Sequence, residues 1–270
     1  MLCFKNTQEV KDIALLDRAF HYGDGCFTTA RIVEGEIELE ALHYARLKLA
    51  CERLSLHVDL GIIEKTLHQM QQLQSRLNGT LKVIISRGEG QRGYSLPNHP
   101  ADLWVYFYPK TVESFHYETI PVGVLQTAMG LSMPNLVGIK TLNRLEQVML
   151  KQEADQLGWS EALVLDVQGS VVEGVSSNCF FRINDTWITP ELRYNGVHGV
   201  MRAEILRRMQ QNGIQCEQRL VDSEELSKIQ SLFFCNALQP MKIATVLDQQ
   251  TLMVEPCIEL FNTLKLNQIA

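Results

Sequence analysis

The chain has 270 residues, of which 46% are hydrophobic and 21% charged, and its formal net charge is −6. At roughly 100–200 residues per domain, this length allows one large or two modest domains. A mildly acidic chain offers no electrostatic footprint for nucleic acid or for an anionic membrane surface, so we expect neither as a partner.

The start of the chain carries charges every few positions, unlike the basic, apolar and small-residue regions of a secretory signal. No apolar run approaches the roughly 18 residues that a membrane-spanning helix needs. The seven cysteines are widely spaced without a C-x-x-C pair, and the histidines lack ligand spacing. We therefore expect a cytoplasmic protein with free thiols, no disulfide framework and no metal site.

A first, small α/β domain is predicted over residues 1–110. Strand-like segments on either side of a Glu34-Gly35 turn indicate a hairpin, and apolar residues at helical spacing follow it. The expected strands are 26–33, 37–39, 81–86 and 103–108, and the expected helices are 41–54 and 62–77. Residues 87–100 are dense in Gly, Arg and Pro and are expected to form a loop.

Residues 111–117 are polar and aperiodic, and we expect them to link the first domain to a larger one over 118–270. The expected strands there are 120–125, 162–166, 178–183, 187–189, 231–235 and 243–247, and the expected helices are 143–157, 199–211 and 257–265. Strands and helices alternate, but several strands come as hairpins. The pattern therefore predicts an α+β or mixed α/β fold in two domains.

Lys140 ends an apolar segment just before an expected helix. Neighbours such as Val137, Ile139 and Leu142 would partly desolvate its amine, which lowers the pKa of a lysine and frees the lone pair for Schiff-base chemistry. Most lysines instead lie at the surface with the charge in water. Local context alone favours that ordinary alternative.

Glu173 lies between two strand signals, in a segment with small hydroxyl residues and a glycine. A carboxylate held there suits a buried site and can pair with a protonated pyridine nitrogen. The alternative is a simple hairpin turn, since Glu-Gly and Ser-Ser-Asn are common turn sequences. Taken alone, the turn is the better interpretation.

Three places offer candidate phosphate contacts. The segment Gly199-Val200-Met201 opens a helix, whose free N–H groups and dipole favour an anion. Asn236-Ala237 follows a buried-looking strand, and Arg46 lies on a helix where it can form a bidentate phosphate contact. Each has an ordinary alternative: a glycine before a helix, a turn and a solvated arginine.

A dinucleotide-binding loop is excluded. Gly88, Gly90 and Gly93 have the G-x-G-x-x-G spacing after a strand, but Tyr94-Ser95-Leu96-Pro97 follows in place of a helix. No P-loop, H-E-x-x-H or G-x-S-x-G motif is present either.

The order of these signals along the chain resembles the fold-type IV pyridoxal-phosphate enzymes. This family includes branched-chain aminotransferases, D-amino acid aminotransferases and 4-amino-4-deoxychorismate lyases. The matching segments are Asp17-Arg18-Ala19-Phe20, Tyr22-Gly23-Asp24-Gly25-Cys26-Phe27, His43-x-x-Arg46-Leu47, Lys140-x-x-Asn143-Arg144-Leu145-Glu146, Glu173-Gly174-Val175-Ser176-Ser177-Asn178 and Gly199-Val200-Met201-Arg202. The resemblance implies a two-domain mixed α/β enzyme that binds pyridoxal phosphate and forms homodimers.

Carried over residue by residue, the resemblance implies that Lys140 is linked covalently to the cofactor and that Glu173 keeps its pyridine nitrogen protonated. The remaining cofactor contacts would come from Arg46, Ser177, Asn178, Val200, Met201, Asn236 and Ala237. The segment Cys235-Asn236-Ala237-Leu238 departs from the Thr-rich pattern of the branched-chain enzymes. His198 stands where many relatives have proline, and it has no assigned role.

Within the family, three segments resemble the lyases: Gly25–Arg31, Ser86–Tyr94 and Asn143–Gln147. The implied reaction converts 4-amino-4-deoxychorismate to 4-aminobenzoate and pyruvate in folate biosynthesis, with Lys140 as general base and Thr29 as a candidate proton donor. Arg92 and Arg87 are candidate partners for the substrate carboxylates, with Tyr94 as a wall. Both arginines have a solvated alternative, which is favoured for Arg87. A D-amino acid or branched-chain aminotransferase, or a non-catalytic cofactor-binding protein, remains the alternative function.

Overall fold

The computed structural model describes residues 1–74 and 76–269, which form two compact units. Unit 1 contains Met1–Glu113 and Ile139–Asn143, and unit 2 contains Ser114–Gly138 and Arg144–Ile269. The change from one unit to the other after Glu113 falls inside the linker expected at 111–117.

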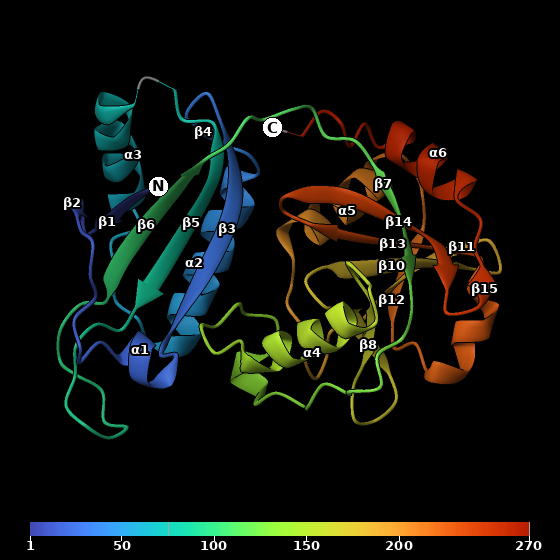
Figure 1. Cartoon of the computed structure of the whole chain (residues 1–270), viewed down its shortest axis with the longest axis horizontal. Coiled ribbons are helices and arrows are strands. Elements are labelled where there is room, and N and C mark those ends of the chain that lie inside the picture. Colours follow the sequence, from blue (N-terminus) through green and yellow to red (C-terminus); the bar gives the residue numbers. More distant parts are fainter. Residues whose placement is uncertain (75, 270) are drawn as a thin grey trace. The chain divides into compact units, whose positions relative to one another are not determined.

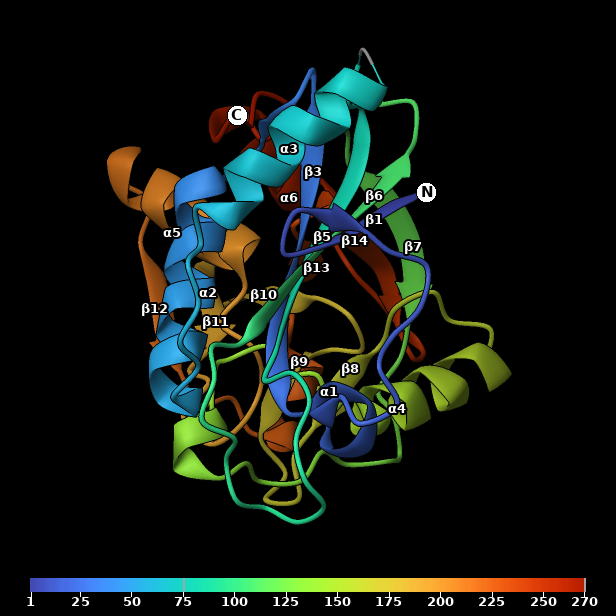
Figure 2. The same cartoon turned by 90° about the vertical axis from the view of Figure 1, so that its left-hand side faces the viewer.

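Unit 1 is built on a six-stranded antiparallel sheet with the strand order β2-β1-β6-β5-β3-β4 (Figure 1). Its strands are β1 (Leu2–Lys5), β2 (Gln8–Glu9), β3 (Gly25–Val33), β4 (Glu36–Ile37), β5 (Gly79–Ser86) and β6 (Asp102–Pro109). Its helices are α1 (Arg18–Tyr22), α2 (Glu40–Leu54) and α3 (Ile62–Leu73). The helices α2 and α3 lie along one face of this sheet (Figure 2).

The core of unit 1 follows from two periodicities. Buried residues alternate along β5, at Leu81, Val83 and Ile85, because successive side chains of a strand point to opposite faces. On α3 the buried positions recur three or four residues apart, from Ile63 to Met70. Each large apolar side chain buried in this way contributes about 1.5–3 kcal/mol to the stability of the fold.

Unit 2 contains a seven-stranded mixed sheet with the order β12-β11-β10-β13-β14-β15, and β7 pairs with β14. The β11–β12 and β7–β14 pairs are parallel and the others antiparallel. Its strands are β7 (Glu118–Val122), β10 (Asn178–Ile183), β11 (Thr186–Pro190), β12 (Cys216–Arg219), β13 (Ser231–Asn236), β14 (Gln239–Leu247) and β15 (Gln250–Thr251), beside a separate hairpin of β8 (Leu163–Leu165) and β9 (Val171–Gly174).

Helices complete unit 2. They are α4 (Leu145–Gln156), α5 (Val200–Gln211) and α6 (Glu255–Thr263), with short 3-10 turns η1 (Pro134–Leu136) and η2 (Ser223–Lys228). The helices α5 and α6 pack against β13, where the rings of Phe180 and Phe233 stack with centroids 4.9 Å apart. The helix α4 buries Leu150 and Ala154 in a second apolar cluster, together with residues of β8 and β9. The strand β9, which carries Glu173, contributes Val171 to one apolar cluster and Val172 to the other. Glu173 is therefore held by a strand that is packed on both sides.

Most expected elements are present, with three differences. The helix expected at 62–77 ends at Leu73, because Gln74 is already extended; Ser75 lies outside the described residues. The short elements β1, β2, β12, β15 and α1 were not predicted, since two to five residues carry too little periodicity. Among the described residues, no helix is long and apolar enough to cross a membrane.

The third difference concerns the segment Ile139–Asn143, which the predicted boundaries place in the second domain. It packs with unit 1, although the peptide chain joins it to unit 2 at both ends. The N–H of Phe27 donates to the carbonyl oxygen of Lys140 at 2.9 Å, and the N–H of Leu142 donates to that of Gly25 at 3.0 Å. These bonds attach the segment to β3 through an isolated antiparallel bridge between Cys26 and Thr141.

Candidate functional site

Lys140 is held at the side of β3 by this backbone pairing. Its side chain is half-buried, and its Nζ lies 4.9 Å from the centroid of the Phe27 ring. The Nζ of Lys82 lies 5.0 Å from the same ring. An aromatic face attracts an ammonium group at such distances. Thr29, the candidate proton donor, is half-buried on β3 two residues from Phe27, so both side chains leave the same face of the strand.

Arg46 reaches β3 from α2. One terminal nitrogen of its guanidinium donates to the hydroxyl of Thr28, which also bonds the Nδ1 of His43 at 2.6 Å. Burial lowers the pKa of His43 to about 3, with the positive charge of Arg46 acting in the same direction. His43 is therefore neutral at pH 7, and Arg46 supplies the positive charge of this cluster. Lys140 thus lies at Phe27 and Arg46 at Thr28, which are adjacent residues of β3. The side chains of Phe27 and Thr28 point to opposite faces of the strand.

The three candidate substrate residues of unit 1 differ in exposure. Arg92 is exposed, and the side chain of Tyr94 is 86% exposed. Arg87 is buried, and its Nε lies 2.8 Å from the Asp24 carboxylate. Its terminal nitrogens donate to the carbonyl oxygens of Leu54 and Ser55 at 2.6 and 3.0 Å.

These contacts change the interpretation of Arg87. Neither a substrate contact nor a solvated loop side chain describes a guanidinium that a carboxylate and two carbonyl oxygens bind inside the unit. Its role is structural, because it joins the end of β5 to the end of α2. The sequence did not reveal this, since Asp24 and Arg87 are 63 residues apart.

In unit 2, Glu173 is buried at the end of β9, with 6% of its surface exposed. Its Oε2 accepts hydrogen bonds from the N–H of Val197 at 3.0 Å and from the Nδ2 of Asn178 at 3.2 Å. Burial lowers the pKa of Arg144, and the negative charge of Glu173 partly opposes that shift. Glu173 is thus a buried carboxyl group held by two hydrogen bonds inside unit 2, and the simple turn is excluded because Glu173 belongs to the β9 strand of the β8–β9 hairpin.

A second buried carboxylate, Glu161, was missed by the sequence reasoning. It is fully buried, and its Oε2 accepts from the hydroxyls of Ser176 and Ser177, both at 2.8 Å. Ser177 in turn accepts from the Nδ2 of Asn236 at 3.1 Å. Glu161 precedes a strand and belongs to no motif. No sequence pattern therefore predicts its contact with Ser176, which lies fifteen residues further along the chain.

The start of α5 lies close to Asn178. Gly199 is the N-cap with extended dihedrals, and no side chain caps the helix. A Cβ on Gly199 would lie 2.0 Å from the Oδ1 of Asn178, so only glycine fits. The first N–H groups of a helix, here those of Val200 and Met201, have no intrahelical acceptor and favour an anion. Asn178 contacts both Glu173 and the residue before this helix, and so connects the carboxylate with the anion site.

Asn236 ends β13, and Ala237 and Leu238 form the turn that leads to β14. The Oδ1 of Asn236 accepts from the N–H groups of Leu238 and Gln239, each at 3.0 Å. The side chain of Asn236 therefore shapes the turn and holds Ser177. Contacts to a phosphate from this turn would have to come from backbone groups.

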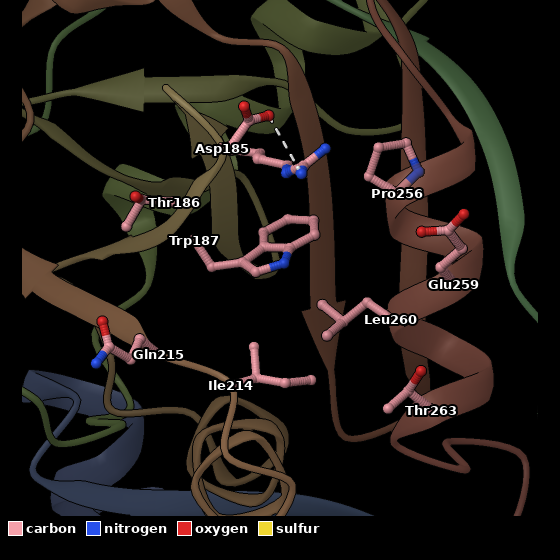
Figure 3. A pocket seen from close by; sticks show the side chains of 10 residues that line it. Asp185, Thr186, Trp187, Ile214, Gln215, Pro256, Glu259, Leu260 and Thr263 are labelled. Atoms are coloured by element: carbon pink, nitrogen blue, oxygen red, sulfur yellow. Dashed lines mark ion pairs between the residues drawn. The ribbon is translucent and has the colours of Figure 1, made fainter.

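A surface hollow of about 390 Å³ in unit 2 has a different lining (Figure 3). Trp187 and Leu260 face each other across it, and the ion pair of Arg182 and Asp185 lies at one end. None of the candidate cofactor residues lines this hollow. It therefore does not mark the cofactor site.

The residues of unit 2 fit pyridoxal phosphate. The cofactor needs a carboxylate for its protonated pyridine nitrogen and an anion site for its phosphate, and Asn178 holds a buried carboxylate next to an uncapped helix start.

Residues 25–245 match the family model of amino-transferase class IV. The chain belongs to this family. It is 30% identical over 229 residues to the aminodeoxychorismate lyase of Vibrio harveyi, covering 84% of each chain. It is 24% identical over 239 residues to the D-alanine aminotransferase of Bacillus licheniformis, covering 87% of this chain and 83% of that one.

Among solved structures, the chain is similar to 4-amino-4-deoxychorismate lyase from Pseudomonas aeruginosa, with a TM-score of 0.86, 32% identity and 98% of each chain covered. An aminotransferase from Mycobacterium tuberculosis in its PLP-bound form shares the fold at 18% identity, with a TM-score of 0.80 over 99% of this chain and 97% of that one. These findings confirm the predicted fold class, the enzyme class and the cofactor, pyridoxal phosphate. The individual site residues stay predictions.

Proposed function

We propose that this protein is a pyridoxal-phosphate-dependent carbon–oxygen lyase that converts 4-amino-4-deoxychorismate to 4-aminobenzoate and pyruvate, in folate biosynthesis. The observation that carries the proposal is the similarity to a lyase structure over 98% of both chains. The lyase relatives are 30% and 32% identical, whereas the D-alanine aminotransferase is 24% identical.

Lys140 has two tasks in this proposal. It would hold the cofactor covalently, and as a neutral amine it would remove the proton from the amine-bearing ring carbon of the substrate. When bound, pyridoxal phosphate supplies an electron sink for the negative charge that develops at that carbon. The C–O bond to the enolpyruvyl group then breaks, and the ring becomes aromatic, which drives the reaction. The hydroxyl of Thr29 is our candidate for protonating the departing enolate.

In this proposal, Glu173 would accept a hydrogen bond from the protonated pyridine nitrogen of the cofactor, and a carboxylate there would favour the protonated form. Most contacts to the phosphate would come from unit 2, where the uncapped start of α5 offers an anion site. The residues proposed for these contacts are Ser177, Asn178, Val200, Met201, Asn236 and Ala237, together with Arg46 of unit 1.

The substrate has two carboxylates and needs cationic partners. Arg92 is the exposed guanidinium of the Gly-rich loop, and Tyr94 offers an exposed aromatic wall beside it. Arg87 is left out of the substrate site because its donors are engaged by Asp24 and by two carbonyl oxygens.

The test is a pyruvate-release assay with the cofactor-loaded protein and 4-amino-4-deoxychorismate. Equal amounts of pyruvate and 4-aminobenzoate are expected. No pyruvate, together with a cofactor spectrum shifted by D-alanine, would replace the lyase with the aminotransferase. Absence of the absorption band at about 410–430 nm, typical of a lysine-bound cofactor, would favour a non-catalytic protein.

We also infer a homodimer in the cytoplasm. The outer face of α4 exposes Leu145, Val148 and Met149, with 72%, 61% and 56% of their surfaces accessible. Three apolar side chains at helical spacing on one exposed face are typical of a surface that a partner covers. Size-exclusion chromatography with light scattering should give twice the 30.7 kDa mass of the chain, and a monomer at all concentrations would contradict the inference.

A further inference from the structure

The Gly-rich loop of unit 1 is fastened to the segment just before β3. The N–H of Arg18 donates to the carbonyl oxygen of Gly88 at 2.9 Å, and the N–H of Gly90 donates to that of Leu16 at 3.1 Å. A Cβ on Gly90 would lie 2.8 Å from the Cδ of Arg18, so the two segments are in close contact. The first half of the loop is therefore fixed by backbone bonds.

The second half of the loop is held differently, by side chains. The guanidinium of Arg18 donates to the carbonyl oxygen of Gly93 at 2.9 Å, and the N–H of Gly93 donates to the hydroxyl of Tyr22 at 3.1 Å. Both polar backbone groups of one residue are thus bound by α1. Gly93 has φ +110°, a left-handed value that favours glycine.

Arg18 is itself rigidly placed. It is 3% exposed, its Nε donates to the Asp24 carboxylate at 2.8 Å, and its guanidinium carbon lies 4.8 Å from the centroid of the Tyr22 ring. Asp24 also pairs with Arg87 at 2.8 Å. The two groups that bind Gly93 therefore belong to one network, in which Arg18 and Arg87 are buried and Tyr22 and Asp24 are half-buried.

The residues on either side of Gly93 are Arg92 and Tyr94, which are exposed. The Tyr94 ring approaches the Tyr22 ring at 5.7 Å between centroids. We propose that Arg18 and Tyr22 are positioning residues, which fix Gly93 so that Arg92 and Tyr94 are presented to a carboxylate-bearing substrate. This inference rests on the proposed function for the identity of that substrate.

A positioning role predicts a specific kinetic signature. Releasing Gly93 lets the loop sample more conformations, and the substrate must then restore the order when it binds. We expect Tyr22→Phe to raise KM about tenfold and to leave kcat within about twofold, which is the pattern of lost uniform binding. Arg18→Lys, which keeps the charge and loses the planar fork, should raise KM further.

The experiment combines steady-state kinetics of the cofactor-loaded enzyme with amide hydrogen exchange of the substrate-free enzyme. The Gly93 amide should exchange about tenfold faster in Tyr22→Phe than in the wild type, because it loses its acceptor. Tyr108→Phe removes a hydroxyl from β6 of the same unit and is the matched control, expected to change neither quantity. Cofactor absorbance should be the same in all variants.

The outcomes separate the two levels of inference. A wild type that releases no pyruvate contradicts the proposed function, and the exchange data still report whether Tyr22 holds Gly93. If pyruvate is released but the KM of Tyr22→Phe is unchanged, the positioning role is wrong and the proposed function stands. A fall in kcat or in cofactor absorbance without a rise in KM also overturns the positioning role.

Discussion

The two units hold their candidate residues by different means. In unit 2, Glu173 and Asn178 lie on strands of the core and are bound by a backbone N–H and by each other. In unit 1, Arg92 and Tyr94 lie on a loop whose second half depends on the side chains of α1. A cofactor that stays bound suits residues placed on core strands, whereas a substrate that enters and leaves suits exposed side chains on a loop.

The largest expected effect on activity separates two lysines that contact the same aromatic ring. Lys140 and Lys82 lie 4.9 and 5.0 Å from Phe27, but only Lys140 is assigned to catalysis. Lys140→Ala should lower kcat by about 10⁴-fold and abolish the visible cofactor band, since both the attachment and the base are lost. Lys82→Ala should leave the band in place, and an equal loss in both variants would contradict the assignment.

A variant of Arg87 tests the arrangement of unit 1 through its stability instead of its activity. Arg87→Met leaves the Asp24 carboxylate without one of its two arginines, so the free energy of unfolding should fall by about 3–5 kcal/mol. Urea unfolding followed by circular dichroism measures this change. Arg92→Met, at an exposed position, should have the same free energy of unfolding as the wild type and show only a raised KM. Equal free energies of unfolding for the two variants would contradict the structural role of Arg87.

Two of the buried carboxyl groups of unit 2, those of Glu173 and Glu161, test the arrangement of that unit. Glu173→Gln should lower kcat by about 100-fold, the scale of losing one fixed electrostatic contact. Glu161→Gln should instead lower stability by about 1–3 kcal/mol, because the hydroxyls of Ser176 and Ser177 lose a charged acceptor. Measuring kcat and urea midpoints for both variants tests the distinction, and a reversed pattern would mean that the roles are exchanged.

The smallest effect concerns His43 and pH. Its pKa in the folded protein is about 3, below the ordinary value of 6.5. Between these pH values the unfolded chain binds more protons than the folded protein. The contribution of His43 to the free energy of unfolding is therefore fully present above pH 6.5 and is lost as the pH falls. From pH 6.5 to 5.5 this loss is about 1 kcal/mol or less. In His43→Gln the unfolding free energy should depend less steeply on pH over that interval, and an unchanged slope would refute the prediction.

Local patterns predicted much of the fold, because strands such as 26–33 and helices such as 41–54 carry their own periodicity. Lys140 and Glu173 were found through the order of motifs along the chain, not through their surroundings. The contacts of Arg87, Glu161 and Arg18 were not predictable, since each joins residues that are distant in sequence. The motif containing Arg18 and Asp24 was recognised, but only the structure shows that these side chains hold the loop around Gly93.

The segment Ile139–Asn143 has a consequence for how the chain is made. Unit 1 receives this segment from a part of the sequence that lies after the first strand of unit 2. During synthesis, the hydrogen bonds of Gly25 and Phe27 to this segment can form only after residue 142 has left the ribosome. A fragment cut after Glu113 would lack these two backbone partners of β3.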